Sequence, residues 1–247
     1  MAVECNAITD YVKWTSPGFG GSSKRTLLMW VNFNITAGAS IFHPIFSMAN
    51  LAGSSSDTTE WLELEIDSDT VSSGFGWPNI TYKGLASPFY TTVTNHYNKV
   101  SLSGWKHIAI TVDGNSPPIY PVLYVNTTLV TNPTPVSRTT YNSGGSFDLH
   151  LNYGSISSAN SDVIQYGSIC LYNRILSTAE IADAYSSKLA IPNTTGLVFA
   201  AQLQGCAGNV GDGGTLSSSN TVANITNGVL GVPNGTVVFR QDAKLTY

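Results

Sequence analysis

The hydrophobic and polar positions of this chain follow the pattern of a protein built almost entirely from β-strands. Short apolar or alternating runs recur along it, each bounded by clusters of Gly, Pro, Ser and Asn, which is typical of strands separated by turns. About ten runs have strand length: residues 8–14, 27–35, 41–49, 61–66, 105–112, 121–130, 147–152, 166–172, 196–203 and 236–240. So many short strands with a single helix predict an all-β fold, a sandwich of two antiparallel sheets or a jelly roll.

One stretch, GSICLYNRILSTAEIADAYS at residues 167–186, has the pattern of an amphipathic helix instead. Ser177 and Glu180 have the spacing of a capping box, in which each side chain binds a backbone N–H at the start of a helix. Leu176 and Ile181 flank that box as a hydrophobic staple. Pro192 cannot continue the helix, so the sequence predicts one short helix near residues 178–188.

Six segments follow one another along the chain: LLMWVNFN, IFSMA, WLELEIDSDT, GWKHIAITVDG, VLYVNTTLV and LYNRILSTAEIADAY. In this order they resemble the laminin-G-like branch of the concanavalin A-like lectin and glucanase superfamily, over roughly residues 8–190. The resemblance implies a jelly roll of two packed antiparallel sheets. In that fold a lone helix follows a late strand and covers part of the sandwich.

The resemblance also bears on domain organisation. Residues 1–190 are predicted to form the laminin-G-like jelly roll. The remaining part, 191–247, contains TGLVFAAQLQG, which is similar to the opening strand of many family members, and TVVFRQ. We expect these C-terminal strands to complete the same sandwich or to pack on it, and a small second domain is the alternative.

Composition narrows the classes of function. Charged residues are 11% of the chain, against about 25% in typical domains, and Ser plus Thr number 55. With 11 Lys and Arg and a net charge of −4, the chain has no basic stripe for nucleic acid. No apolar run is long enough to cross a membrane, and MAVECNAITD lacks the pattern of a signal peptide.

The three cysteines are far apart, so neither a disulfide framework nor a zinc site is predicted, and Cys170 is expected to be a small buried apolar side chain.

Three carboxylates form the sharpest enzymatic hypothesis. Glu63, Glu65 and Asp67 alternate with apolar residues and so share one face of a predicted strand. The resemblance makes them candidates for catalysis, because superfamily glucanases carry their catalytic carboxylates in this way. However, ELEID departs from the glucanase motif at both later positions, and a retaining glycosidase needs its two carboxyls about 5 to 5.5 Å apart. We therefore expect a strand with one face in the core and a charged face in water.

His107 in GWKHIAI is a second residue with chemical potential, as a general base. No Gly-x-Ser-x-Gly elbow accompanies any histidine of the chain. The resemblance makes His107 structural, adjoining a packed Trp105.

Calcium is the one cofactor that the resemblance suggests, because family members often hold it at one rim of the sandwich. The oxygen donors near predicted loops are Asp57, Asp67, Asp69, Asp113 and Asp162, of which Asp67, Asp69 and Asp113 are the calcium candidates. They form no recognisable spaced set, so no metal site is predicted. In the resemblance, Asp113 matches the Asp of the Asp-Gly turn that is typical of the family. Asn126 falls where the family prefers Asn-Gly, and because Thr127 replaces the Gly we expect an altered hairpin turn.

Residues 75–97, FGWPNITYKGLASPFYTTVTNHY, gather aromatic side chains together with Pro and Gly. Sugars are commonly held by aromatic faces beside amide side chains. The candidate carbohydrate-binding residues are Trp77, Tyr82, Tyr90, Asn79 and Asn95. Ordinary packing and contact with another protein are the alternatives.

Together these observations predict a non-enzymatic binding or structural module with a lectin-like fold. Low charge, many small polar residues and an initial Met without a signal peptide favour a bacteriophage decoration or adhesion protein on the virion surface, or else on an extracellular surface. Its expected partners are other virion or surface proteins, copies of itself and cell-surface glycans. A carbohydrate-binding lectin domain of a cellular surface protein is the alternative, and a glycoside hydrolase is a weaker one.

Overall fold

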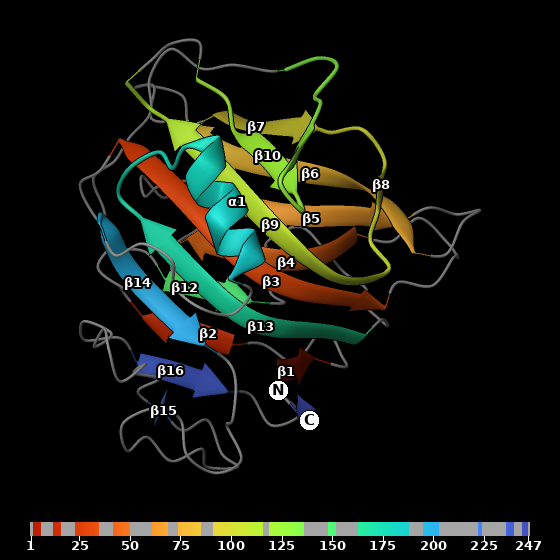
Figure 1. The fold of residues 1–247 in the computed structure, drawn as a ribbon, viewed down its shortest axis with the longest axis vertical. Coiled ribbons are helices and arrows are strands. Elements are labelled where there is room, and N and C mark those ends of the chain that lie inside the picture. The colour runs from red at the N-terminus through yellow and green to blue at the C-terminus, as the bar shows by residue number, and fades with distance from the viewer. Residues whose placement is uncertain are drawn as a thin grey trace.

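The structure is a computed structural model of the chain. It describes residues 2–5, 12–15, 23–34, 42–49, 61–68, 74–84, 91–115, 119–135, 148–151, 163–187, 195–202, 222–223, 236–239 and 244–246. Within these residues the chain forms two antiparallel sheets and a single short helix (Figure 1). The predicted all-β jelly-roll sandwich is therefore confirmed.

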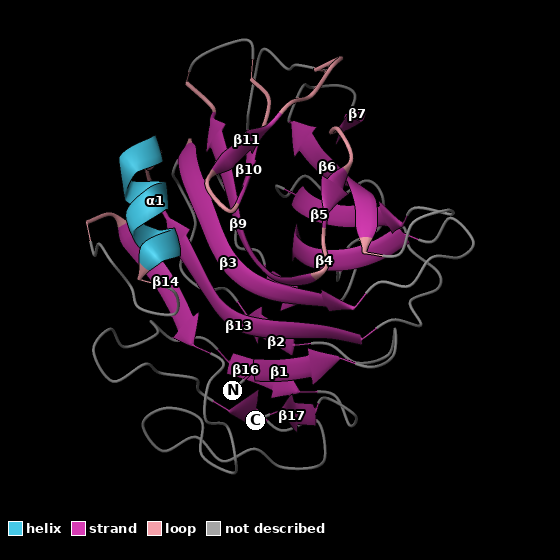
Figure 2. Ribbon diagram, turned by 45° about the vertical axis from the view of Figure 1, so that its right-hand side comes forward, coloured by secondary structure: helices cyan, strands magenta, loops and turns pink. Residues whose placement is uncertain are grey.

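The first sheet carries the helix. Its strands, in spatial order, are β11 (Thr128–Val130), β10 (Val122–Val125), β9 (Gly104–Asp113), β3 (Lys24–Asn34), β13 (Val163–Tyr172), β1 (Ala2–Cys5) and β17 (Lys244–Thr246). A further strand, β14 (Leu197–Gln202), pairs with the later half of β13, while β1 pairs with its earlier half. Long central strands and short edge strands thus make up one curved layer (Figure 2).

The second sheet lies behind the first in the view of Figure 1. Its strands, in spatial order, are β15 (Val222–Ala223), β16 (Thr236–Phe239), β2 (Val12–Thr15), β12 (Asp148–Leu151), β4 (Phe42–Ala49), β5 (Trp61–Ser68), β6 (Phe75–Gly84) and β7 (Thr91–His96). The two-residue strand β8 (Val100–Ser101) pairs with the start of β6. Strands β5, β6 and β7 are consecutive neighbours, so their side chains form one continuous outer face.

Alternation along the strands places the core between the sheets. Leu27 and Met29 of β3 face the second sheet, Leu64 and Ile66 of β5 face the first, and each is at most 2% exposed. Burying an aliphatic side chain of this size contributes roughly 1.5–3 kcal/mol relative to leaving it in water. The residues between them project outward, so the polar positions of β5 and β6 belong to the outer face of the second sheet.

The helix α1 (Thr178–Ser186) begins where the sequence predicts. The Ser177 hydroxyl accepts the Glu180 N–H at 3.2 Å, and the Glu180 carboxylate accepts the Ser177 N–H at 2.9 Å, so the capping box is confirmed. Ile181 and Ala184 are buried against the outer face of the first sheet. Figure 2 shows the helix lying on that face beside β14. Cys170, on the same face, is buried and free, and burial raises the pKa of its thiol to about 12, as expected for a small apolar side chain.

Some strand predictions were incomplete. The run 121–130 is two strands, β10 and β11, and the aromatic stretch 75–97 contains β6 and β7. The two-residue turn between β10 and β11 has φ of 48° at Asn126 and 70° at Thr127, which are the left-handed values of a tight hairpin turn. The prediction that Thr127 alters this turn is therefore wrong, because Thr127 adopts the conformation that Gly usually supplies.

The C-terminal strands extend both sheets. β14 pairs with β13, β16 with β2 and β17 with β1. These pairings support the proposal that residues 191–247 complete one sandwich with residues 1–190. In the described part of the chain, no helix is long and apolar enough to cross a membrane.

Candidate functional site

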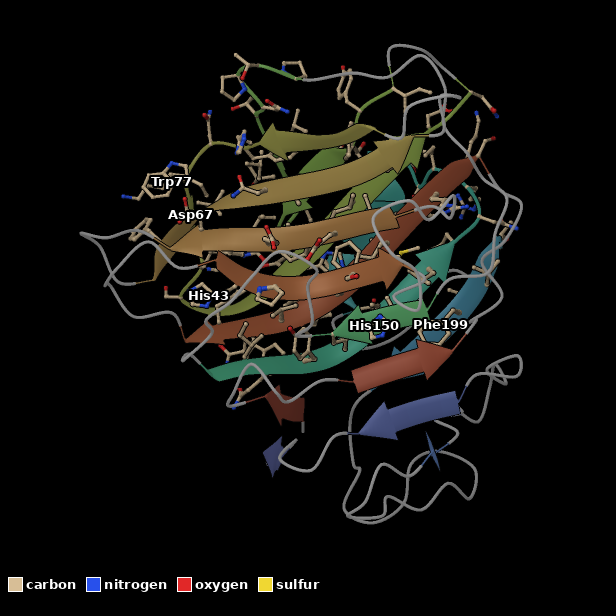
Figure 3. The ribbon with its side chains drawn as sticks, turned by 180° about the vertical axis from the view of Figure 1, so that it is seen from behind. His43, Asp67, Trp77, His150 and Phe199 are labelled. Atoms are coloured by element: carbon tan, nitrogen blue, oxygen red, sulfur yellow. The ribbon has the colours of Figure 1, made fainter. Side chains whose placement is uncertain are left out.

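An aromatic patch lies on the outer face of the second sheet. Phe75 and Trp77 are two residues apart in β6, so their rings share this face, and they are 40% and 37% exposed. Trp77 pairs with Asp67 of β5, and Figure 3 shows these two residues together at one side of the sheet. The Lys99 ammonium lies 5.2 Å from the centre of the Phe75 ring and 5.4 Å from that of Trp77. Both distances allow cation–π attraction, and we call Phe75, Trp77 and Lys99 the aromatic patch.

The backbone under the patch is tightly held. A Cβ added at Gly76 would lie 2.6 Å from the Ile66 side chain and 2.8 Å from the Asp67 carbonyl oxygen. Only glycine therefore allows β6 to approach β5 so closely between the two aromatic residues. The rings stand on a strand that pairs with β5 on one side and with β8 on the other.

Polar groups continue the same face beyond the patch. Asn79, two residues after Trp77, is only 3% exposed, and its Oδ1 accepts a hydrogen bond from Nδ1 of His96 at 2.8 Å. His96 belongs to β7 and is exposed. The Asn79 amide is therefore held by the protein itself, and His96 presents the polar surface next to the rings.

The two glutamates of β5 lie on this outer face, but they are not in water. Glu63 is 0% exposed and Glu65 is 3% exposed. The prediction of a charged strand face in solvent is wrong for both, because other parts of the protein cover this section of the face. Asp67, nearer the end of the strand, is partly exposed.

The buried carboxyls of Glu63 and Glu65 hydrogen-bond to each other. Burial raises the pKa of Glu65, while the hydrogen bond from Glu63 opposes that rise. Among the described residues, Oε1 of Glu65 has no hydrogen-bond partner. A retaining glycosidase places its carboxyls about 5 to 5.5 Å apart on either side of a sugar, whereas this pair is in direct contact and covered.

A row of buried polar side chains runs from this pair towards β2. His150 of β12, Ser47 of β4 and Glu63 of β5 are directly opposite one another in register, and each is at most 3% exposed. Figure 3 shows His150 on the strand next to β2 and His43 nearer the middle of the sheet. Because these side chains are buried, the row offers no open surface to a ligand.

The structure brings together only part of the predicted carbohydrate site. Trp77 and Asn79 share one face of one strand, as the alternation requires. Tyr90 and the side chains of Tyr82 and Asn95 lie outside the described residues, although the backbone register pairs Tyr82 with Leu62, a core residue. Their assignment to a sugar site stays a prediction.

His107 lies on the other sheet, beneath the helix. Its ring centre is 5.3 Å from that of Trp30 and 6.1 Å from that of Tyr185. The side chain is 2% exposed, and burial lowers its pKa to about 4, so it is neutral near pH 7 and poorly matched to general-base chemistry. The predicted neighbour was wrong: Trp105 is 41% exposed, and Trp30 packs against His107 instead.

The two calcium candidates that the structure describes, Asp67 and Asp113, do not lie together. Asp113 forms a salt bridge with Lys24 at 3.3 Å and accepts the N–H of Asn115 at 3.0 Å, which is its expected role in the Asp-Gly turn. Asp67 lies on the other sheet. Asp57, Asp69 and Asp162 lie outside the described residues. Among the residues that the structure describes, no group of three or more His, Cys, Asp or Glu could hold a metal ion.

Comparison with known proteins identifies the fold and no family. No protein-family description and no curated protein sequence matches the chain. The heptameric SAP-like pentraxin of Limulus polyphemus is similar in structure, with a TM-score of 0.51 and 11% identity over 98% of this chain and 94% of the pentraxin chain. This likeness shows a lectin-like jelly roll.

Two further solved structures are similar over part of their length. The ligand-binding domain of botulinum neurotoxin serotype D has a TM-score of 0.48 and 11% identity over 75% of this chain and 42% of its own. The enzymatically active domain of tailspike protein 2 of bacteriophage CBA120 has a TM-score of 0.48 and 14% identity over 74% of this chain and 27% of its own. The chain thus spans less than half of either of these proteins.

Proposed function

We propose that this protein is a surface-displayed carbohydrate-binding module that holds a sugar on the aromatic patch. The observation that carries the proposal is the pair of exposed rings, Phe75 and Trp77, on one face of a paired strand. The C–H faces of a sugar ring pack against aromatic faces, and a few fixed polar groups then orient it. His96 and Asp67 provide such groups beside the rings.

Rigidity supports this role. Aromatic side chains lose little conformational freedom when they bind, because they have only two rotatable bonds. Here the strand under them is fixed by Gly76 and by pairing on both sides. A platform that is already in place costs less to order on binding than a mobile loop does.

We further propose that the module binds and does not hydrolyse its sugar. The candidate catalytic carboxyls, Glu63 and Glu65, are buried and in contact with each other. A sugar and a water molecule would both have to reach them, and the described structure leaves them no exposed surface. Glu63→Gln is therefore expected to leave sugar binding unchanged, and turnover of any bound glycan that this variant abolishes would contradict the proposal.

The setting of the module rests on composition. A chain that is only 11% charged and contains 55 Ser and Thr fits a particle surface covered by small neutral groups. We therefore propose a laminin-G-like adhesion or decoration protein of a phage virion, which contacts other virion proteins or further copies of itself. Size-exclusion chromatography with light scattering would test for the copies, and a monomer at all concentrations would contradict that part.

The proposed function is tested by binding to an array of neutral and acidic glycans, with calcium and with chelator. Wild type is expected to bind a related set of glycans, and Trp77→Ala to lose at least about tenfold in affinity, since truncating a central aromatic anchor costs 2 kcal/mol or more. Trp105→Ala is the matched control, because Trp105 is 41% exposed but lies on the other sheet. Equal losses in both variants, or no binding by wild type, would contradict the proposal.

A further inference from the structure

A shallow groove of about 380 Å³ lies next to the aromatic patch. One wall is the segment 98–101, which contains β8, and the other is the hairpin of β10 and β11. Ser101 in the first wall pairs with Phe75 of the patch, so the groove begins one strand away from the rings. Neighbouring strands are about 4.8 Å apart, which is close to the length of one sugar ring. A chain of sugars that leaves the patch in this direction therefore reaches the groove with its next unit.

The lining of the groove combines hydroxyl and amide groups with an exposed leucine. Ser101 and Thr128 are exposed hydroxyl residues on opposite walls, and Asn126 is half-buried at the hairpin turn. Leu129 of the hairpin is 53% exposed. A sugar unit has the same two kinds of surface, because its hydroxyls lie around the edge of the ring and its C–H groups cover the faces. A concave site with apolar contacts and a few fixed polar groups suits such a ligand.

Hydrogen bonds fix both walls of the groove. The backbone N–H of Asn98 donates to the Thr131 carbonyl at 2.9 Å, and the Asn98 side-chain amide donates to the Thr131 hydroxyl at 2.6 Å, so the two walls are tied together at this end. On the hairpin side, the Asn126 N–H donates to the His107 carbonyl at 2.8 Å, and Oδ1 of Asn126 accepts the His107 N–H at 2.9 Å. The groove is thus largely formed before a ligand arrives, which lowers the cost of binding.

We propose that the site takes a linear oligosaccharide, with one sugar on the aromatic patch and the next unit in the groove. The inference rests on the proposed function, because it names the length of glycan that the same site takes. The chain passes Lys99, which lies over both rings and also lines the groove. Its second unit then meets Leu129 and the hydroxyls of the two walls. A few further hydrogen bonds and one apolar contact are enough for a tenfold gain in affinity, which corresponds to about 1.4 kcal/mol.

Cello-, malto- and chito-oligosaccharides of one, two and three units provide the test, since only the length changes within each series. Binding is measured by titration at millimolar ligand, followed by NMR of the indole N–H signals. We expect wild type to bind the two-unit or three-unit chain of at least one series about tenfold or more tightly than the single sugar. The series in which this gain appears identifies the linkage.

Thr128→Trp fills the groove from the hairpin side, so it is expected to remove the gain with length and to leave the affinity for the single sugar unchanged. Leu129→Ala should reduce the gain in part, because it removes the apolar contact. Thr178→Trp is the matched control, since Thr178 is an exposed threonine at the start of α1 and does not line the groove. Thermal melts of each variant exclude loss of fold as the cause.

Two kinds of result would overturn the inference, and they are distinguishable. If wild type binds one, two and three units equally, if Thr128→Trp keeps the gain, or if array glycans bind but none of these chains does, the groove takes no second unit of a linear chain and the proposed function survives. If neither these chains nor any glycan of the array binds, the proposed function fails and the inference fails with it.

Discussion

Replacing Thr127 with glycine is expected to stabilise the protein. Thr127 has a φ of 70°, and a non-glycine residue in the left-handed region costs about 1–2 kcal/mol, with β-branched residues among the least suited to it. Glycine removes this cost, but it adds about 0.5–1 kcal/mol of entropy to the unfolded chain. From the middle of each range the difference is a gain of roughly 0.75 kcal/mol, which raises Tm by roughly 2–3 °C in a chain of this length.

Asn126→Gly is the control in the same turn. Asn126 has a φ of 48°, which Asn tolerates, and its Oδ1 accepts the His107 N–H at 2.9 Å. Glycine here relieves little strain and removes a hydrogen bond that contributes about 0.5–1.5 kcal/mol, so Tm should fall. Differential scanning calorimetry of both variants gives the comparison. A Tm for Thr127→Gly at or below that of wild type would refute the reasoning, because the strain would then not lie at this residue.

Four further predictions concern the helix cap and the buried groups. Ser177→Ala should lower the free energy of unfolding by about 1 kcal/mol in urea titrations, as expected for a lost helix cap, and an unchanged value would show that the cap does not matter. The Arg174 guanidinium and the Ser177 N–H hold the pKa of Glu180 at about 2, so wild type should lose stability as the pH falls from 4.5 towards 2; Glu180→Gln should lose less over this range, and an equal loss would contradict the reasoning. Burial raises the pKa of Glu65, so the folded state binds a proton more tightly than the unfolded state, and the free energy of unfolding falls as the pH rises above 4.5 through that pKa. The free energy of unfolding of Glu65→Gln should therefore increase relative to that of wild type as the pH rises. A constant difference between the two proteins across this pH range would contradict the prediction. With the other two cysteines replaced by serine, Cys170 should resist Ellman's reagent at pH 8 until denaturant is added, since its pKa is about 12, and rapid reaction in buffer would show that it is accessible.

The helix could be predicted closely because its signals are local. The capping residues Ser177 and Glu180 are three positions apart, and their mutual hydrogen bonds follow from helix geometry alone. The bond between Arg174 and Glu180, at 2.6 Å, could not be predicted in this way. It depends on the path of the chain before the helix, which no repeat in the sequence specifies.

Strand β6 was missed because its sequence argues against a strand. Gly76 and Pro78 weaken local strand propensity, and proline cannot donate to a sheet ladder. Pairing along β5, from Trp61 with Lys83 to Ser68 with Gly76, overrides that local preference. Tertiary contacts of this kind cannot be read from a short window of sequence.

The same reason limits prediction of the site. Alternation alone indicates that Trp77 and Asn79 share a face. Lys99 and His96 reach that face only because β7 returns beside β6 and β8 then pairs with the start of β6. The spacing of ELEID likewise gives the face on which Glu65 lies but not whether that face is covered.

The pairing of β17 with β1 places residues 244–246 beside residues 2–5 (Figures 1 and 2). During synthesis at about 5–20 residues per second, β1 leaves the ribosome roughly 10–50 s before its neighbour exists. For that time the outer edge of β1 presents unpaired N–H and C=O groups, and such an edge can recruit strands from other nascent chains. The yield of folded protein therefore depends on whether the chain is completed before the edge of β1 associates with another chain. Slower translation should lower the soluble yield.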